Sequence, residues 1–178
     1  PYFDVFFAGI EVDTLSITRA SIKLLNFLDI EPVILPQERC CGHDLLWSGD
    51  IENLEMLCRL NYDEFKSAGV EKIVVSCPEC HHVLSRHMPE VVPEFDLEVV
   101  FLLDLLESEI KKGGIGFKPY KRKVTYQDPC RLGRMARKYD VPRELLLMIP
   151  EVRFREMENS GTGATCCGNS GFINCDAY

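Results

Sequence analysis

The chain has 178 residues, of which 46% are hydrophobic and 27% are charged, the balance of an ordinary globular protein. This composition excludes a disordered, collagen-like or coiled-coil chain, and no apolar run reaches the roughly 18 residues that cross a bilayer. The length fits one large domain or two small ones. No basic stretch followed by an apolar segment is visible at the start, so the sequence predicts a cytoplasmic chain without a secretory leader.

The net charge of −8 hides an uneven distribution of charge. Residues 111–138 hold ten of the twenty basic residues and one acidic residue, whereas the rest of the chain is strongly acidic. We expect no nucleic-acid partner, because the acidic body would repel a phosphate backbone. The basic stretch is either a solvated face or a surface that meets an anionic cluster, an anionic substrate or an acidic partner.

Apolar periodicity and turn residues predict strands that alternate with helices. Strands are expected at 3–9, 32–36, 72–76, 99–101, 123–127 and 152–154. Helices are expected at 13–28, at 44–68 with a break at 48–50, after Cys80 to about residue 88, and at 103–112, 132–139 and 142–149. Asp13 is expected to cap the first of these helices and Pro142 to begin the last. The alternation favours an α/β fold with a parallel sheet, whose chemistry gathers at the carboxyl ends of the strands.

Nine cysteines are the strongest feature of the composition. In a reducing compartment, clustered thiols suggest metal or redox chemistry rather than disulfides. Cys-Cys-Gly occurs at 40–42 and again at 166–168, and Cys-Pro-Glu-Cys occupies 77–80. Cys77 lies 36 positions after Cys41, and Cys166 lies 36 positions after Cys130. We interpret the chain as two copies of one unit, at 1–115 and 116–178, with the second ending before a CxxC of its own.

This spacing of cysteines suits a metal cluster. Thiolates bind soft metals, and one site needs about four of them. Adjacent cysteines diverge and can reach different metals of one cluster, and a following glycine lets the backbone approach inorganic sulfide. A CxxC at a strand-to-helix turn directs two sulfurs at one centre, where the helix N-terminus favours thiolate charge. Such cysteines are typical of iron–sulfur clusters.

The two units resemble the cysteine-rich CCG domains found in the B and D subunits of heterodisulfide reductase and in related iron–sulfur oxidoreductase subunits. The segment VTYQDPCRLGR at 124–134 is similar to the family's YHDPCHLGR, and VPRELL at 141–146 resembles the segment that follows it. The resemblance implies an α/β fold of two related Rossmann-like lobes with mostly parallel strands and cysteines at strand carboxyl ends. It implies a [4Fe–4S] cluster of non-cubane type in each lobe. The implied ligands are Cys40, Cys41, Cys77, Cys80, Cys130, Cys166 and Cys167.

The resemblance also implies a function. The chain would be the cysteine-rich part of an oxidoreductase that takes electrons from a ferredoxin-like domain or subunit. The electrons would reduce a disulfide or meet an anionic thiol substrate, or pass to a membrane cytochrome or another quinone-reactive subunit. Such a partner would hold the chain at the inner face of the membrane. The alternative is a non-catalytic assembly domain that is stabilised by zinc or free of metal.

The sequence departs from the family pattern in three places. The family's leading Gly-Cys is here Gly9-Ile10, so the first unit lacks one thiolate. The family histidines beside the first cysteine of the second unit are here Gln127 and Arg131, and the second CxxC is absent. We therefore expect the isolated chain to hold no intact cluster at the second site. Zinc stays an alternative for the first unit, because its four cysteines suffice for a tetrahedral site.

Other interpretations of single residues stay open. Residues 77–81 also match the covalent haem motif C-x-x-C-H, which requires export, and Cys77 with Cys80 could form a thioredoxin-like dithiol. Cys58 lies between leucines in a predicted helix, so it is expected in the core. Cys175 is expected to be structural or incidental. His43 follows the first Cys-Cys-Gly and either donates a hydrogen bond to cluster sulfur or faces solvent.

Overall fold

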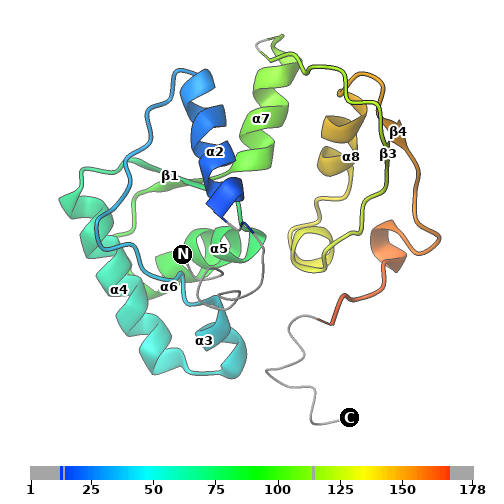
Figure 1. Ribbon diagram of the computed structural model, residues 1–178. Helices are drawn as coiled ribbons and strands as arrows, with labels where there is room; N and C mark the ends of the chain where they lie inside the picture. Colours follow the sequence, from blue (N-terminus) through cyan, green and yellow to red (C-terminus); the bar gives the residue numbers. More distant parts are fainter. Residues whose placement is uncertain (1–12, 14, 114, 169–178) are drawn as a thin grey trace.

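The computed structural model describes residues 13, 15–113 and 115–168 (Figure 1). The predicted strand at 3–9, Ile10 and Cys175 lie outside the described residues. We refer to 13–113 as the N-terminal region and to 115–168 as the C-terminal region. Figure 1 shows them on opposite sides of the molecule, with α7 between α2 and α8.

The N-terminal region contains most of the helices. They are α2 (Leu15–Phe27), α3 (His43–Ser48), α4 (Ile51–Ser67) and α7 (Leu102–Lys111). A further helix runs from α5 (Pro78–His82) through the π-helical turn η1 (Val83–His87) into α6 (Met88–Val91). Strands β1 (Lys72–Val75) and β2 (Glu98–Phe101) flank this continuous helix in the sequence and pair in parallel.

The C-terminal region repeats this connection on a smaller scale. It contains β3 (Lys123–Val124), the π-helical turn η2 (Arg131–Met135), α8 (Asp140–Leu147), β4 (Arg153–Phe154) and the short 3-10 turn η3 (Gly161–Gly163). β3 and β4 pair in parallel, with Lys123 opposite Arg153. The described chain therefore has a mixed α/β fold with two small parallel sheets, which confirms the expected class.

One apolar core stabilises the N-terminal region. Buried side chains from α4 and from the continuous helix α5–α6 meet under the sheet, and each such side chain contributes about 1.5–3 kcal/mol by leaving water. Met88, Val83, Val92 and Cys58 are fully buried. The whole buried cluster consists of Cys41, Leu54, Cys58, Tyr62, Val83, Leu84, Met88, Val92 and Leu97. The core position predicted for Cys58 is confirmed.

Local sequence signals set the helix boundaries. The carboxylate of Asp13 accepts a hydrogen bond from the backbone N–H of Ser16 at 3.0 Å, as a capping residue should. Gly49 adopts a left-handed conformation, and Asp50 then caps α4, so the predicted break at 48–50 is confirmed. No described helix is long and apolar enough to cross a membrane.

Several predicted elements were wrong in detail. Residues 32–36 form no strand, because no described strand pairs with them and a proline stands at each end. β3 stops at Val124 because its partner β4 has two residues. The predicted helix 132–139 is the π-helical turn η2, which ends before Arg137 adopts a positive φ of 58°. α8 begins at Asp140, so Pro142 lies in its first turn rather than at its first position.

Candidate metal centre

The first Cys-Cys-Gly lies in the loop before α3, where two residues fix its shape. Buried Asn61 of α4 donates through Nδ2 to the carbonyl of Cys40 at 2.9 Å. Gly42 has a φ of 89°, and its N–H donates to Cys40 Sγ at 3.4 Å. A Cβ at Gly42 would lie 2.7 Å from the Leu54 side chain, so both the conformation and the space require glycine.

The CxxC motif occupies the turn from β1 into α5, as its position in the sequence predicts. Cys77 is the N-cap of α5, and Pro78 follows in the first turn. The carbonyl of Cys77 accepts the N–H of His81 at 3.0 Å, which places Cys80 on the first turn of the helix. The helix N-terminus therefore lies beside Cys77, where the backbone N–H groups of Glu79 and Cys80 help to lower the pKa of its thiol.

The structure brings the four cysteines of the N-terminal region together as a chain of contacts. Cys40 contacts Cys41, Cys41 contacts Cys80, and Cys80 contacts Cys77. The hydrogen bonds from Cys40 and Cys80 lower the pKa of Cys41, and the bond from Cys80 lowers the pKa of Cys77. The same bonds raise the pKa values of Cys40 and Cys80, so ionisation is favoured at Cys41 and Cys77.

The contacts are pairwise and do not converge on one point. Among the described residues, no three or more His, Cys, Asp and Glu side chains have the arrangement of a metal site. Cys58 stays outside the chain of thiols, and burial raises its pKa to about 11.

The second Cys-Cys-Gly has the same local geometry as the first. Gly168 has a φ of 79°, and its N–H donates to Cys166 Sγ at 3.4 Å. Cys166 and Cys167 are exposed, however, whereas Cys130 is half-buried. Gln127, where the family has histidine, donates to the carbonyl of Thr165 at 3.0 Å and ties the second motif to the segment before Cys130.

A polar network supports the segment before Cys130. Arg143 of α8 binds both carboxylate oxygens of Asp128 at 2.7 Å, and it also contacts Glu156. The N–H of Gly161 donates to Asp128 Oδ2 at 2.6 Å. These bonds hold the pKa of buried Asp128 below its ordinary value, with Arg143 as the larger cause. The network fixes residues 128–130 relative to α8 and to the loop that contains Gly161.

A contact between the two regions lies beside the cysteines. Glu79, inside the CxxC, has its Oε1 3.2 Å from Arg131 Nε and 3.3 Å from His43 Nε2. The Arg131 guanidinium lies over the Trp47 ring at 4.0 Å. The contact with His43 first, and the charge of Arg131 after it, lower the pKa of Glu79.

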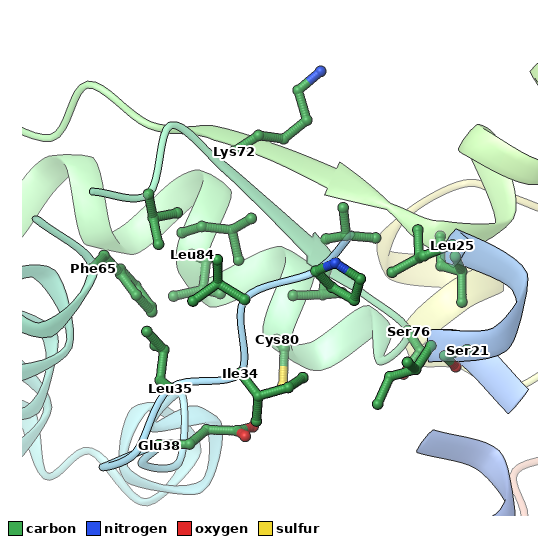
Figure 2. A pocket seen from close by; sticks show the side chains of 18 of the residues that line it. Ser21, Leu25, Ile34, Leu35, Glu38, Phe65, Lys72, Ser76, Cys80 and Leu84 are labelled. Carbon is green, nitrogen blue, oxygen red and sulfur yellow. The ribbon is translucent and has the colours of Figure 1, made fainter. Parts of the chain in front are cut away.

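A groove of about 620 Å³ opens beside the first set of cysteines. Its walls come from α2, the segment 30–39 and β1, and Cys41, Cys77 and Cys80 are among the residues that line it. Figure 2 shows Cys80 with its sulfur directed toward Ile34 of that segment. Three of the four thiols therefore border a mostly apolar cavity, and Cys41 among them also belongs to the buried core.

The residues present fit an iron–sulfur cluster in their chemistry. Four thiols are already in contact and two of them favour the thiolate, which is the metal-binding form. His43 is 4% exposed; its Nε2 contacts Glu79, and its Nδ1 has no hydrogen-bond partner among the described residues. A buried donor beside Cys41 without an acceptor suits a bound group whose sulfur accepts hydrogen bonds. The solvent-exposed alternative for His43 was wrong.

Three residues of the site were missed as functional by the sequence analysis. Asn61 is a polar residue on the buried face of α4. The amphipathic pattern of the helix could have shown this, because a buried polar side chain needs a hydrogen-bond partner. Glu79 lies between two predicted ligands. Arg131 was noted as a departure from the family pattern, but its contact with Glu79, 52 positions away, has no signal in one sequence.

Comparison with known proteins agrees with the cysteine geometry. The model of the Cysteine-rich domain family, CCG, matches residues 11–85 and 124–177. The chain belongs to this family. The resemblance seen in the cysteine motifs is thus confirmed, and each matched stretch includes one Cys-Cys-Gly.

Relatives of this family member come from archaea and bacteria. An uncharacterized iron-sulfur protein of Methanocaldococcus jannaschii is 33% identical over 94% of this chain and 32% of its own length. The D subunit of the dihydromethanophenazine:CoB–CoM heterodisulfide reductase of Methanosarcina acetivorans is 33% identical over 95% of this chain and 43% of its own length. A probable glycolate oxidase iron-sulfur subunit of Bacillus subtilis is 27% identical over 95% of this chain and 40% of its own length.

The chain spans less than half the length of these relatives. Their names place the CCG domain in heterodisulfide reductase and iron-sulfur oxidoreductase subunits. No solved structure matches the chain significantly.

Proposed function

We propose that the chain is the cluster-binding part of a heterodisulfide-reductase-like oxidoreductase. The observation that carries this proposal is the chain of contacts from Cys40 through Cys41 and Cys80 to Cys77, the last three of which line a groove. Thiols that border a cavity, two of them with a lowered pKa, are suited to a soft metal. The iron-sulfur names of the relatives support iron as that metal.

The residues would share the work as follows. Cys40, Cys41, Cys77 and Cys80 would hold a cluster in the N-terminal region, and Cys130, Cys166 and Cys167 would hold one in the C-terminal region. A bound cluster supplies one-electron redox chemistry. Gly42 and Gly168 keep the backbone close to the cysteines, and buried His43 offers a hydrogen bond. The helix N-terminus at Cys77 stabilises negative charge.

The wider arrangement is part of the same proposal. Residues 1–115 and 116–178 would form two related Rossmann-like lobes, supported by the parallel crossover in each region and by the shared geometry of the two glycines. The clusters would be of the non-cubane [4Fe–4S] type. Electrons would come from a ferredoxin-like domain or subunit and reduce a disulfide. A membrane cytochrome or quinone-reactive partner would place the chain at the inner face of the membrane.

Metal analysis of protein prepared without oxygen tests the proposal. The full-length protein is expressed anaerobically, and iron, acid-labile sulfide and zinc are measured per chain. Iron with an equal amount of sulfide supports the cluster. Zinc without sulfide supports the assembly domain instead and overturns the proposal.

Single cysteine variants locate the site. Cys41→Ser should remove most of the iron of the N-terminal region, because Cys41 contacts two other thiols. Cys58→Ala is the matched control, since Cys58 is fully buried and outside the chain of thiols. Equal iron loss in both variants would show that the thiol chain does not bind the metal.

A further inference from the structure

Four side chains connect the two regions at the cysteine motifs. His43 and Trp47 lie one helical turn apart in α3, Glu79 lies in α5, and Arg131 begins η2. We call this set the inter-region bridge. Glu79 contacts both His43 and Arg131, and Arg131 stacks on Trp47. The rings of His43 and Trp47 lie 5.8 Å apart, so the four side chains close a ring.

Three members of the ring lie next to a candidate ligand in the sequence, and the fourth, Trp47, packs on two of these three. His43 follows the first Cys-Cys-Gly directly, and Glu79 stands between Cys77 and Cys80. Arg131 follows Cys130 directly. A displacement of Arg131 relative to Glu79 would therefore move the Cys130 turn relative to the CxxC turn.

The bridge is shielded enough to be strong. The side chains of His43, Arg131 and Glu79 are 5%, 18% and 34% exposed. An ion pair that is partly buried is screened less than one in open solvent. The guanidinium plane over an indole adds a cation–π interaction, the strongest of its class with tryptophan. Lysine could not reproduce both the stacking and the directional bond to the carboxylate.

Two other ion pairs also join the regions, and none of their four residues is adjacent to a cysteine in the sequence. Lys138 contacts Asp104 of α7 at 2.7 Å, and Lys111 of α7 contacts Glu144 of α8 at 3.2 Å. These pairs hold α7 against the C-terminal region. They provide a matched comparison, because removing one of them loosens the same interface without touching a residue beside a cysteine.

We propose that Glu79 is a positioning residue that sets the separation of the two cysteine sites through Arg131. The inference rests on the proposed function for its meaning, since the distance between two bound redox groups governs electron transfer between them. The geometry itself belongs to the protein without its metal. Glu79 fixes the CxxC turn and the Cys130 turn as one unit, and the stacking of Arg131 on Trp47 extends that unit to α3.

Hydrogen exchange on the metal-free full chain tests the bridge without any cluster. Glu79→Gln removes the charge but keeps the shape. The exchange rate of the η2 amides, Arg131–Met135, should rise at least fivefold, and that of α3 should rise as well. Asp104→Asn is the control and should speed exchange in α7 and η2 but not in α3. Unchanged exchange of η2 in Glu79→Gln overturns the proposal.

A conservative variant and a charge swap separate positioning from stability. Arg131→Lys should give an intermediate rise in exchange, because it keeps the charge and loses the stacking on Trp47. The double variant Glu79→Arg with Arg131→Glu should restore slow exchange in η2 if the pair itself matters. Faster exchange in the double variant than in either single variant overturns the pairing.

The loaded protein gives a second, spectroscopic readout. In the full-length protein prepared without oxygen, Glu79→Gln should weaken the spin–spin coupling between the reduced sites, measured by electron paramagnetic resonance, whereas Asp104→Asn should keep the wild-type spectrum. If no iron binds at all, the proposed function fails while the exchange result still decides the bridge. If iron binds and the coupling is identical in Glu79→Gln, the bridge does not set the separation.

Discussion

The two regions carry the same cysteine motif on very different supports. In the N-terminal region, Cys41 belongs to an apolar core that α4 and the helix α5–α6 build together. In the C-terminal region, the buried centre is a charged one, in which Arg143 binds Asp128 and Glu156. The motif itself is alike in both, with a left-handed glycine donating to the first sulfur.

This difference shows what the support adds to the motif. Over the apolar core, four thiols are in contact and two of them favour ionisation. Over the polar network, Cys166 and Cys167 are exposed. The Cys-Cys-Gly turn is therefore a local property of its sequence, whereas the gathering of thiols depends on packing beneath it. The predictions below break each support in turn.

The largest effect is expected from the charged centre. Arg143→Met should destabilise the C-terminal region by about 3–5 kcal/mol, because it leaves the buried carboxylate of Asp128 unpaired. The side chains of Arg143 and Asp128 are 15% and 2% exposed, so water cannot replace the lost partner. Urea denaturation measures the change in the free energy of unfolding, and hydrogen exchange of the native protein shows in which region stability is lost.

The exchange pattern distinguishes a local from a general effect. The amides of α8 and η2 should exchange faster in Arg143→Met, and those of α4 should keep their wild-type rates. The double variant Arg143→Met with Asp128→Leu should recover part of the loss, because it removes the unpaired charge. Equal loss of protection in α4 would show that the two supports are one cooperative unit.

The apolar core should give the next largest effect. Met88 is fully buried, and Met88→Ala should cost about 2–5 kcal/mol through lost transfer free energy and a cavity. Thermal unfolding measures the cost. The contacts among the four thiols should loosen with the core, so Cys41 and Cys80 should react faster with a maleimide. Exposed Met56 of α4 supplies the control, since Met56→Ala should be close to neutral.

The sequence predicted the parts of this comparison that depend on neighbours in the chain. The break at Gly49 and the position of Cys77 after β1 both follow from local residue preferences. The expected strand at 32–36 failed because a strand needs a partner, and none of the described strands pairs with it. The bonds from Glu79 to Arg131 and from Asp128 to Arg143 join residues 52 and 15 positions apart. Patterns of local residues carry no signal for such pairs.

The two glycines offer a smaller, directly matched comparison. An alanine in a left-handed conformation costs roughly 1–2 kcal/mol at either position. Gly42→Ala should cost about 1 kcal/mol more, since its Cβ would lie 2.7 Å from Leu54, whereas no atom of the described residues lies within 4 Å of a Cβ at Gly168. Chemical denaturation of both variants measures the difference. Equal costs would mean that Leu54 moves aside freely.

The smallest effect is a dependence of stability on pH that belongs to the charged centre. The pKa of Asp128 lies below its ordinary value of 3.8 in the folded chain, because Arg143 and the N–H of Gly161 bind the carboxylate. The folded state therefore binds fewer protons than the unfolded state near that pH. The stabilisation is complete above 3.8 and is lost as the pH falls through the folded pKa.

Asp128→Asn isolates this contribution. The difference in free energy of unfolding between wild type and Asp128→Asn should be constant from pH 7 down to about 5 and should shrink as the pH falls below 3.8. This loss of stability at low pH is smaller than the loss in Arg143→Met. Protonation leaves a neutral carboxyl at Asp128, whereas Arg143→Met leaves a buried, unpaired charge there. Asp96→Asn, at a solvent-exposed ion pair with Lys66, should show little of this dependence. A difference that stays constant down to pH 2 would mean that Arg143 does not stabilise the ionised carboxylate, and the contrast between the two supports would then rest on packing alone.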